Sequence, residues 1–153
     1  GLNGLETLPG LIILIGLSVI SGEYVLTIIP IICLIYLGYL SVTGSAFIGN
    51  VGSFSIGLTL AVYAILANIK LFLIISLAPH LFNSILILFS NYILHDRADT
   101  LMDEKGSLYA IRVRSLRTLI IKYKKMTEHR VVLFITMMSA VCVVIAYLIT
   151  MMI

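Results

Sequence analysis

Long apolar stretches without charged residues are the feature that most constrains this chain. From Tyr24 to Ile69 the sequence contains no Asp, Glu, Lys or Arg. A helix that crosses a bilayer needs about 20 mostly apolar residues. Hydrophobic residues make up 61% of the chain and charged residues 11%, against roughly 45–50% and about 25% in soluble domains. The composition predicts an integral membrane protein. It excludes a water-soluble domain, a disordered chain and a nucleic-acid-binding protein.

Five apolar stretches reach or approach the length of a membrane span. They are 8–20, 24–42, 51–69, 71–94 and 131–153. The first is short, and Pro79 interrupts the fourth because proline disrupts a helix interior. A tight turn at Ala67–Lys70 is expected between the third and the fourth stretch. The predicted fold class is all-α, a polytopic transmembrane helix bundle of about five spans.

The basic residues mark one face of the membrane. Nine of the ten Lys and Arg residues lie in the loop 95–130, which the positive-inside rule places in the cytoplasm. Alternation of the spans then puts residues 1–6 and 41–50 on the same side, and Glu23 and Lys70 on the other. Polar groups are thus expected to gather on the cytoplasmic face, as in a protein that handles a soluble compound there.

The cytoplasmic loop has predicted structure of its own. Residues 101–113 are expected to form a small β-hairpin, because Asp103-Glu104-Lys105-Gly106 supplies turn residues between two short strands. Apolar residues then recur at helical spacing between basic ones: Leu116, Leu119, Ile120, Tyr123 and Met126. This pattern predicts a basic amphipathic helix on the membrane surface. A solvated loop with no ligand of its own is the alternative.

Three segments could carry chemistry, and each has a structural alternative. The glycine-rich segment 44–57 suits a phosphate at a helix N-terminus, or close packing of helices. His80 and Asn83 suit a functional site, or hydrogen bonds to a neighbouring helix. Arg97 suits a phosphate contact, or an anchor at the membrane border. The sequence contains no Cys/His metal-binding cluster and no Walker loop. The residues alone therefore predict a membrane protein with a polar, possible anion-binding face.

Three segments, in order along the chain, resemble one family. Residues 1–6 (GLNGLE) resemble a G-x-NGLE segment, and residues 47–53 (FIGNVGS) resemble an F-x-G-D-x-G-S segment at a helix start. Residues 78–83 (APHLFN) are similar to a P-Q-x-F-N segment. All three are found in the polyprenyl-phosphate N-acetylhexosamine-1-phosphate transferases. The likeness is greatest to the dolichyl-phosphate GlcNAc-phosphotransferases and their archaeal relatives.

The resemblance implies that residues 1–153 form the C-terminal half of one integral-membrane transferase domain. The implied reaction moves GlcNAc-1-phosphate from UDP-GlcNAc to a polyprenyl phosphate of the dolichyl type and releases UMP. Mg²⁺ is the implied cofactor, with Mn²⁺ as its substitute. The catalytic carboxylates are expected in an N-terminal half that this sequence lacks. The expected partners are the N-terminal half and the lipid bilayer, and a homodimer is left open. The membrane is either a cell membrane or that of the endoplasmic reticulum.

The resemblance also implies roles for single residues. Asn3 matches a residue that hydrogen-bonds the uracil, and Phe47 matches one that stacks on it. Asn50 stands at the position of a metal-binding aspartate. This departure matters because an amide oxygen carries no net charge, whereas Mg²⁺ prefers anionic oxygens. Weaker metal binding is therefore expected unless other carboxylates compensate.

His95, Asp96 and Arg97 fall where the family places a loop that binds the pyrophosphate and the amino sugar. Asp96 departs from the basic pattern of that loop. Two further interpretations stay open. One is a catalytically weakened pseudoenzyme of the same fold, suggested by Asn50. The other is an unrelated transporter or channel subunit, which would line a path with polar groups at several depths.

Overall fold

The computed structural model describes residues 2–94, 100–103 and 106–152. Helices form 75% of it, and the described residues include one small two-stranded sheet, in agreement with the all-α class. The elements are α1 (Thr7–Ser21), α2 (Val25–Val42), α3 (Gly49–Leu66), α4 (Lys70–Ser76), α5 (Ala78–Phe89), a π-helical turn (Ser90–Leu94), β1 (Thr100–Met102), β2 (Leu108–Ala110), α6 (Leu116–Tyr123) and α7 (Glu128–Met152).

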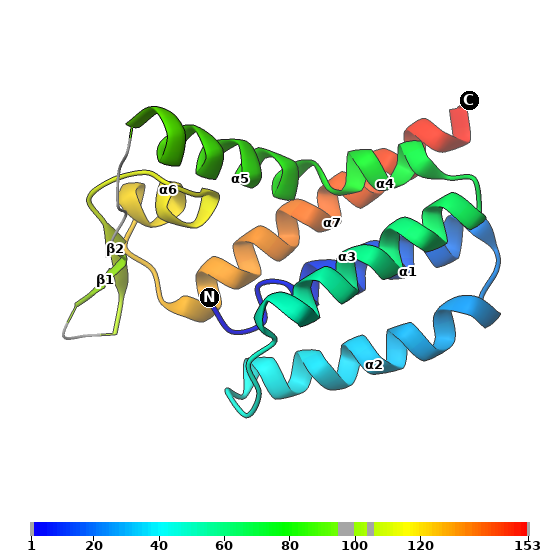
Figure 1. Ribbon diagram of the computed structural model, residues 1–153, viewed down its shortest axis with the longest axis horizontal. Helices are drawn as coiled ribbons and strands as arrows, with labels where there is room; N and C mark the ends of the chain where they lie inside the picture. The colour runs from blue at the N-terminus through cyan, green and yellow to red at the C-terminus, as the bar shows by residue number, and fades with distance from the viewer. Residues whose placement is uncertain (1, 95–99, 104–105, 153) are drawn as a thin grey trace.

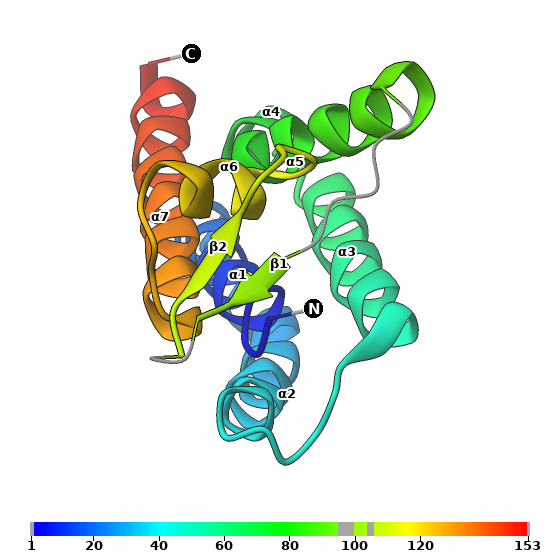
Figure 2. The same cartoon turned by 90° about the vertical axis from the view of Figure 1, so that its left-hand side faces the viewer.

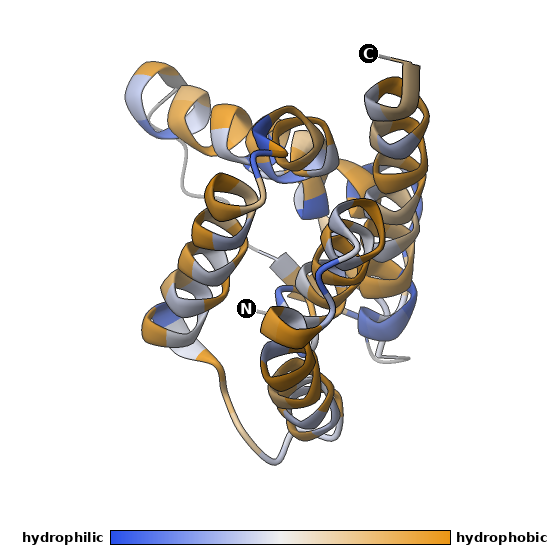
Figure 3. Cartoon of the chain, turned by 90° about the vertical axis from the view of Figure 1, so that its right-hand side faces the viewer, coloured by the Kyte–Doolittle hydropathy of each residue, from blue (hydrophilic) through white to orange (hydrophobic). Residues whose placement is uncertain are grey.

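The apolar stretches of the sequence form the long helices. Among the described residues, α2 and α3, of 18 residues each, and α7, of 25, are long and apolar enough to cross a membrane. The pair α4 and α5 makes a fourth candidate if the two helices count as one span. Helix α1 has 15 residues and is shorter than a usual span, so the predicted fifth crossing stays a prediction. Many large apolar side chains of the long helices are exposed, and orange, hydrophobic stretches dominate these helices in Figure 3.

The fourth apolar stretch is broken where the sequence predicted an interruption. Helices α4 and α5 meet at Leu77 and are bent by 59° relative to each other. Pro79 follows at the start of α5, where its missing N–H costs no helical hydrogen bond. The turn between α3 and α4 also lies at the predicted place, and Asn68 there has a φ of 55°.

The connections between helices gather at two opposite ends of the bundle. One end carries the N-terminal segment, the α2–α3 loop, the sheet and α6, as Figure 1 shows and as the end-on view of Figure 2 repeats. The other end carries the α1–α2 and α3–α4 connections. There the Tyr63 hydroxyl donates a 2.9 Å hydrogen bond to the Glu23 carbonyl. The predicted grouping of polar segments at one end is therefore present in the fold; we call this the polar end.

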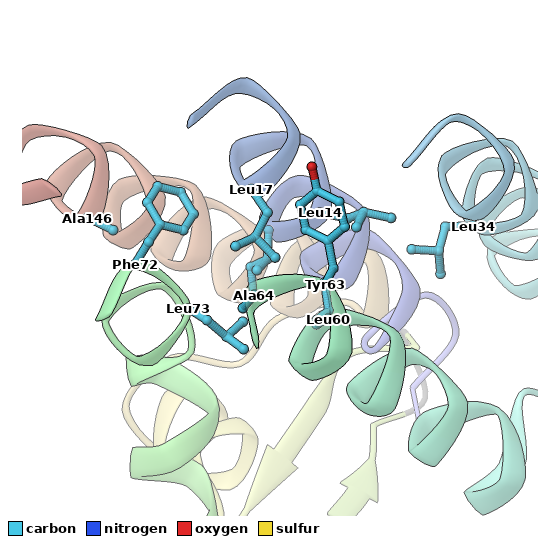
Figure 4. Close-up of a cluster of buried hydrophobic side chains, with 10 residues drawn as sticks. Leu14, Leu17, Leu34, Leu60, Tyr63, Ala64, Phe72, Leu73 and Ala146 are labelled. Atoms are coloured by element: carbon cyan, nitrogen blue, oxygen red, sulfur yellow. The ribbon is translucent and has the colours of Figure 1, made fainter. Parts of the chain in front are cut away.

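The central core lies between α1, α3, α4 and α7. Figure 4 shows Leu17, Phe72 and Ala146 converging from three of these helices, and all three side chains are fully buried. A 2.7 Å hydrogen bond between the Ser18 and Thr27 hydroxyls joins α1 to α2 inside the bundle. Small and hydroxyl-bearing residues are common at such helix contacts in membranes, because they allow close approach.

A short hairpin and a short helix lie where the sequence predicts them, with shorter bounds than expected. Their cytoplasmic location and the position of the helix on the membrane surface stay predictions. Strands β1 and β2 are antiparallel, with Leu101 opposite Tyr109; Glu104 and Lys105 of the predicted turn lie outside the described residues. Two residues of the predicted apolar helix face differ. Tyr123 is 85% exposed, and Met126 lies beyond α6, bridged to Leu108. The helical spacing of apolar residues extends to Met126 in the sequence. However, α6 ends at Tyr123, because the chain after it turns back and pairs with β2.

The buried face of α6 packs on protein. Leu116 and Ile121 belong to a small second core with Leu108 of β2 and with Val131 and Ile135 of α7. The loop therefore forms a compact layer over the end of α7. The exposed side of α6 and the chain after it carry Lys122, Lys124 and Lys125.

Candidate functional site

The N-terminal segment is held in place by two backbone hydrogen bonds. The Asn3 N–H donates to Glu128 Oε1 at the start of α7 (2.7 Å), and the Gly4 N–H donates to Ser41 Oγ near the end of α2 (2.9 Å). Gly4 has a φ of 81°. A Cβ at this position would also lie 2.8 Å from the Val42 side chain. Glycine is thus required both for the backbone conformation and for the close approach to α2.

A cavity of about 130 Å³ opens beside this segment at the polar end. Its lining includes Asn3, Glu6, Phe47 and Asn50, and we call it the asparagine cavity. Three residues that the resemblance assigns to nucleotide or metal binding are therefore neighbours here, although 47 positions separate Asn3 from Asn50. Phe47 is 74% exposed, so one face of its ring is free for stacking.

Glu6 connects the N-terminal segment to the start of α3. The Ser53 hydroxyl hydrogen-bonds the Glu6 carboxylate and also lies 2.8 Å from the Gly49 carbonyl. Gly49 begins α3 with a φ of 63°, which favours glycine. The two motifs 1–6 and 47–53 are thus joined by a side-chain contact.

A second, larger cavity lies on the other side of Glu6. Its volume is about 340 Å³, and we call it the arginine cavity. Its polar lining residues are Glu6, His80, Asn83, Arg114, Ser115, Arg117 and Thr118. Because Glu6 lines both cavities, they are adjacent. The arginine cavity brings together α5, the start of α6 and the segment before α1.

Asn83 fixes α6 against α5. Its Oδ1 accepts a 2.8 Å hydrogen bond from the backbone N–H of Leu116, the first residue of α6. Ser115 and Thr118 form a reciprocal capping box at the same helix end. Of the two interpretations of Asn83, a hydrogen bond to a neighbouring helix is the one observed. This bond positions Arg114 and Arg117 on either side of the helix start.

Two positively charged side chains, Arg114 and Arg117, lie in this cavity beside the Glu6 carboxylate. Both are half-buried. Burial lowers the pKa of the Arg117 guanidinium, the Glu128 carboxylate raises it, and the Arg114 charge lowers it further. Arginine stays protonated at neutral pH despite such shifts. The cavity therefore carries two neighbouring positive charges.

The structure leaves part of the predicted site untested. His95, Asp96 and Arg97 lie outside the described residues, so their predicted contact with pyrophosphate stays a prediction. Within residues 2–94, 100–103 and 106–152, no three His, Cys, Asp or Glu residues are grouped to hold a metal ion. Asn50 and Glu6 share the asparagine cavity. They fit a partial Mg²⁺ ligand set, since such sites are often completed by substrate phosphates and water.

Sequence reasoning did not single out Glu6, Ser53, Arg114 or Arg117. For the first two a signal was present, because both lie within the motifs that carry the family resemblance. The two arginines had none: in the sequence they are two of nine basic residues in one loop. Only the packing of α6 against α5 separates them from their neighbours.

Comparisons with known proteins identify no relative of this chain. No protein-family model matches the chain, and no curated protein matches it. The functional interpretation therefore rests on the three motifs and on the two cavities that they line.

Proposed function

We propose that this protein transfers N-acetylglucosamine-1-phosphate from UDP-GlcNAc to a polyprenyl phosphate of the dolichyl type. The observation that carries the proposal is the asparagine cavity, which gathers Asn3, Phe47 and Asn50 from two motifs. The apolar helices agree with this proposal, because they would hold the protein in the bilayer, where a polyprenyl acceptor also lies. The family proposed is that of the polyprenyl-phosphate N-acetylhexosamine-1-phosphate transferases, with the polar end on the cytoplasmic face.

The uridine of the donor would occupy the asparagine cavity. The Asn3 amide has both a donor and an acceptor for the uracil edge, and the exposed Phe47 ring offers a stacking surface. Gly4 and Ser41 hold Asn3 in position through the 2.9 Å bond to the Gly4 N–H. The nucleoside alone would exceed the 130 Å³ of this cavity, so it would extend through the open side where Phe47 lies.

The reaction is an in-line phosphoryl transfer. An oxygen of the acceptor phosphate forms a bond to the sugar-side phosphorus of UDP-GlcNAc, and the bond from that phosphorus to the bridging oxygen breaks. UMP leaves with the bridging oxygen, and the lipid keeps a pyrophosphoryl sugar. Enzymes accelerate such transfers mainly by positioning and by neutralising charge. Mg²⁺ bound beside Asn50 and Glu6 would supply part of that neutralisation.

The neutral Asn50 makes carboxylates from another part of the protein necessary in this proposal. The weakened pseudoenzyme would bind UDP-GlcNAc without turning it over. A transporter or channel finds less support, because the cavity that gathers Asn3, Glu6 and Asn50 is lined by the N-terminal segment and the start of α3 at the polar end.

We expect the whole protein, including any segment before Gly1, to release UMP from UDP-GlcNAc when polyprenyl phosphate and Mg²⁺ are both present. Purified protein in nanodiscs is incubated with radiolabelled UDP-GlcNAc, and both UMP and the labelled lipid are measured. Omission of the acceptor lipid or chelation of the metal should each abolish both products. A folded preparation that binds UDP-GlcNAc but yields no UMP would indicate the pseudoenzyme. One that does not bind it would contradict the proposal altogether.

A further inference from the structure

The arginine cavity holds two guanidinium groups and one carboxylate, that of Glu6, so two positive charges face a single negative one in its lining. Within the described ranges, neither Arg114 nor Arg117 has a side-chain hydrogen bond or an ion-pair partner. Half-buried charges without partners are costly because they lose solvation. The two guanidinium groups also repel each other, because the Arg114 charge lowers the pKa of Arg117. An anion between them would offset both costs.

Two carboxylates lie near the arginines, and neither forms an ion pair with them within the described ranges. Glu6 is hydrogen-bonded by the Ser53 hydroxyl, at the border with the asparagine cavity. Glu128 accepts the 2.7 Å bond from the Asn3 N–H and does not line the cavity in the described structure. Its charge acts on Arg117 without a direct ion pair.

The remaining lining suits a phosphate ester. Asn83 uses its Oδ1 to accept from Leu116, which leaves its amide N–H groups as donors, and His80 adds a ring nitrogen. Pro79, Ile87 and Ile135 form an apolar wall beside these groups. A volume of about 340 Å³ is at the small end of ligand pockets. It has room for a phosphate group together with part of an apolar or sugar-like substituent.

We propose that Arg114 and Arg117, together with His80 and Asn83, form a binding site for a phosphate monoester, separate from the asparagine cavity. The planar fork of each arginine can make two parallel hydrogen bonds to phosphate oxygens. The ligand is either the headgroup of a membrane lipid or a soluble phosphate compound. Binding joins α5 to α6 and the segment before α1. This site does not depend on the proposed transferase function.

The test uses the double variant Arg114→Gln/Arg117→Gln of the whole protein in phosphatidylcholine nanodiscs. In one arm, inorganic phosphate is titrated by calorimetry in a phosphate-free buffer. In the other, the nanodiscs also contain phosphatidic acid, whose headgroup is a phosphate monoester, and native mass spectrometry counts the retained lipid. The variant should weaken phosphate binding about tenfold to a hundredfold, since hydrogen bonds to charged groups are among the stronger ones. Lys124→Gln, at an exposed position of the same loop, should change neither readout.

Loss in the phosphatidic acid arm alone identifies a lipid headgroup, and loss with inorganic phosphate alone identifies a soluble ligand. Equal losses in Lys124→Gln and the double variant would contradict the proposal, as would unchanged binding in both arms. If the glutamine variant does not fold, Arg114→Lys/Arg117→Lys keeps the charges but loses the planar forks, and weaker binding is again expected. UMP release is measured in parallel: binding that depends on the arginines without UMP release keeps this site and rejects the transferase.

Discussion

Asn50→Ala is expected to lower the rate of UMP release about a hundredfold. Asn50 lines the asparagine cavity together with Glu6. In the proposed site its amide oxygen would ligate Mg²⁺, or its amide N–H groups would donate to the donor pyrophosphate. Stabilisation of transition-state charge by a metal ion contributes several kcal/mol to such reactions. Losing one ligand of a site that already lacks an aspartate should therefore be severe. Initial rates with radiolabelled UDP-GlcNAc at saturating acceptor lipid measure the effect.

Two further variants make this prediction sharper. Asn50→Asp restores a negative charge and should lower the Mg²⁺ concentration needed for half-maximal rate. Ser55→Ala is the matched control, because Ser55 is an exposed residue of α3 whose hydroxyl bonds only the Val51 carbonyl among the described atoms (2.8 Å). An unchanged rate in Asn50→Ala, or a Mg²⁺ dependence that Asn50→Asp does not shift, would remove Asn50 from the site.

Phe72→Ala is expected to cost about 3–5 kcal/mol of stability, the usual range for a large buried aromatic residue. Phe72 has no exposed surface, and Figure 4 shows its ring between α4, α1 and α7. Packing is the main force between helices in lipid, so a cavity at this point loosens three of them together. Unfolding of the purified protein in mixed detergent micelles measures the loss. Phe134→Ala, at a position that is 47% exposed, should cost clearly less.

Glycine variants test the same contact from the other side. A Cβ on Gly16 would lie 2.6 Å from the Val143 side chain and 3.0 Å from the Phe72 ring, so Gly16→Ala should destabilise through overpacking. At Gly57, also inside a helix, a Cβ would meet no atom within 4 Å. Gly57→Ala should be neutral or slightly stabilising because alanine favours helix. Equal stability of the two variants would contradict the described packing of α1 against α4 and α7.

Much of the fold followed from the sequence because span length and proline have direct physical consequences in a membrane. The interruption at Pro79 and the turn at Ala67–Lys70 were both at the predicted places. The end of α6 was not predictable from spacing. Met126 continued the apolar period, but pairing with Leu108 withdrew it from the helix. Such a pairing depends on where β2 lies in space, which local periodicity does not encode.

The candidate site was predictable to a similar extent. Alternation of the spans was enough to bring the motifs containing Asn3 and Asn50 to one end, and the structure places both residues on one cavity. The arginine cavity was not predictable, because it depends on tertiary contacts of α6, among them its packing on α7 and the hydrogen bond from the Leu116 N–H to Asn83 Oδ1. That bond joins residues 33 positions apart, and no local pattern in the loop distinguishes Arg114 and Arg117 from the other basic residues.

Photolabelling with 5-azido-UDP-GlcNAc tests whether the asparagine cavity binds the uracil of the donor, because the azide of this probe lies on the uracil. The whole protein is irradiated with the probe, digested and analysed by mass spectrometry. We expect labelled peptides from residues 2–6 or 47–54, with labelling suppressed by excess UMP and by Phe47→Ala. Labelling confined to the opposite end of the bundle, around Glu23 or Lys70, or labelling that excess UMP does not suppress, would contradict this expectation.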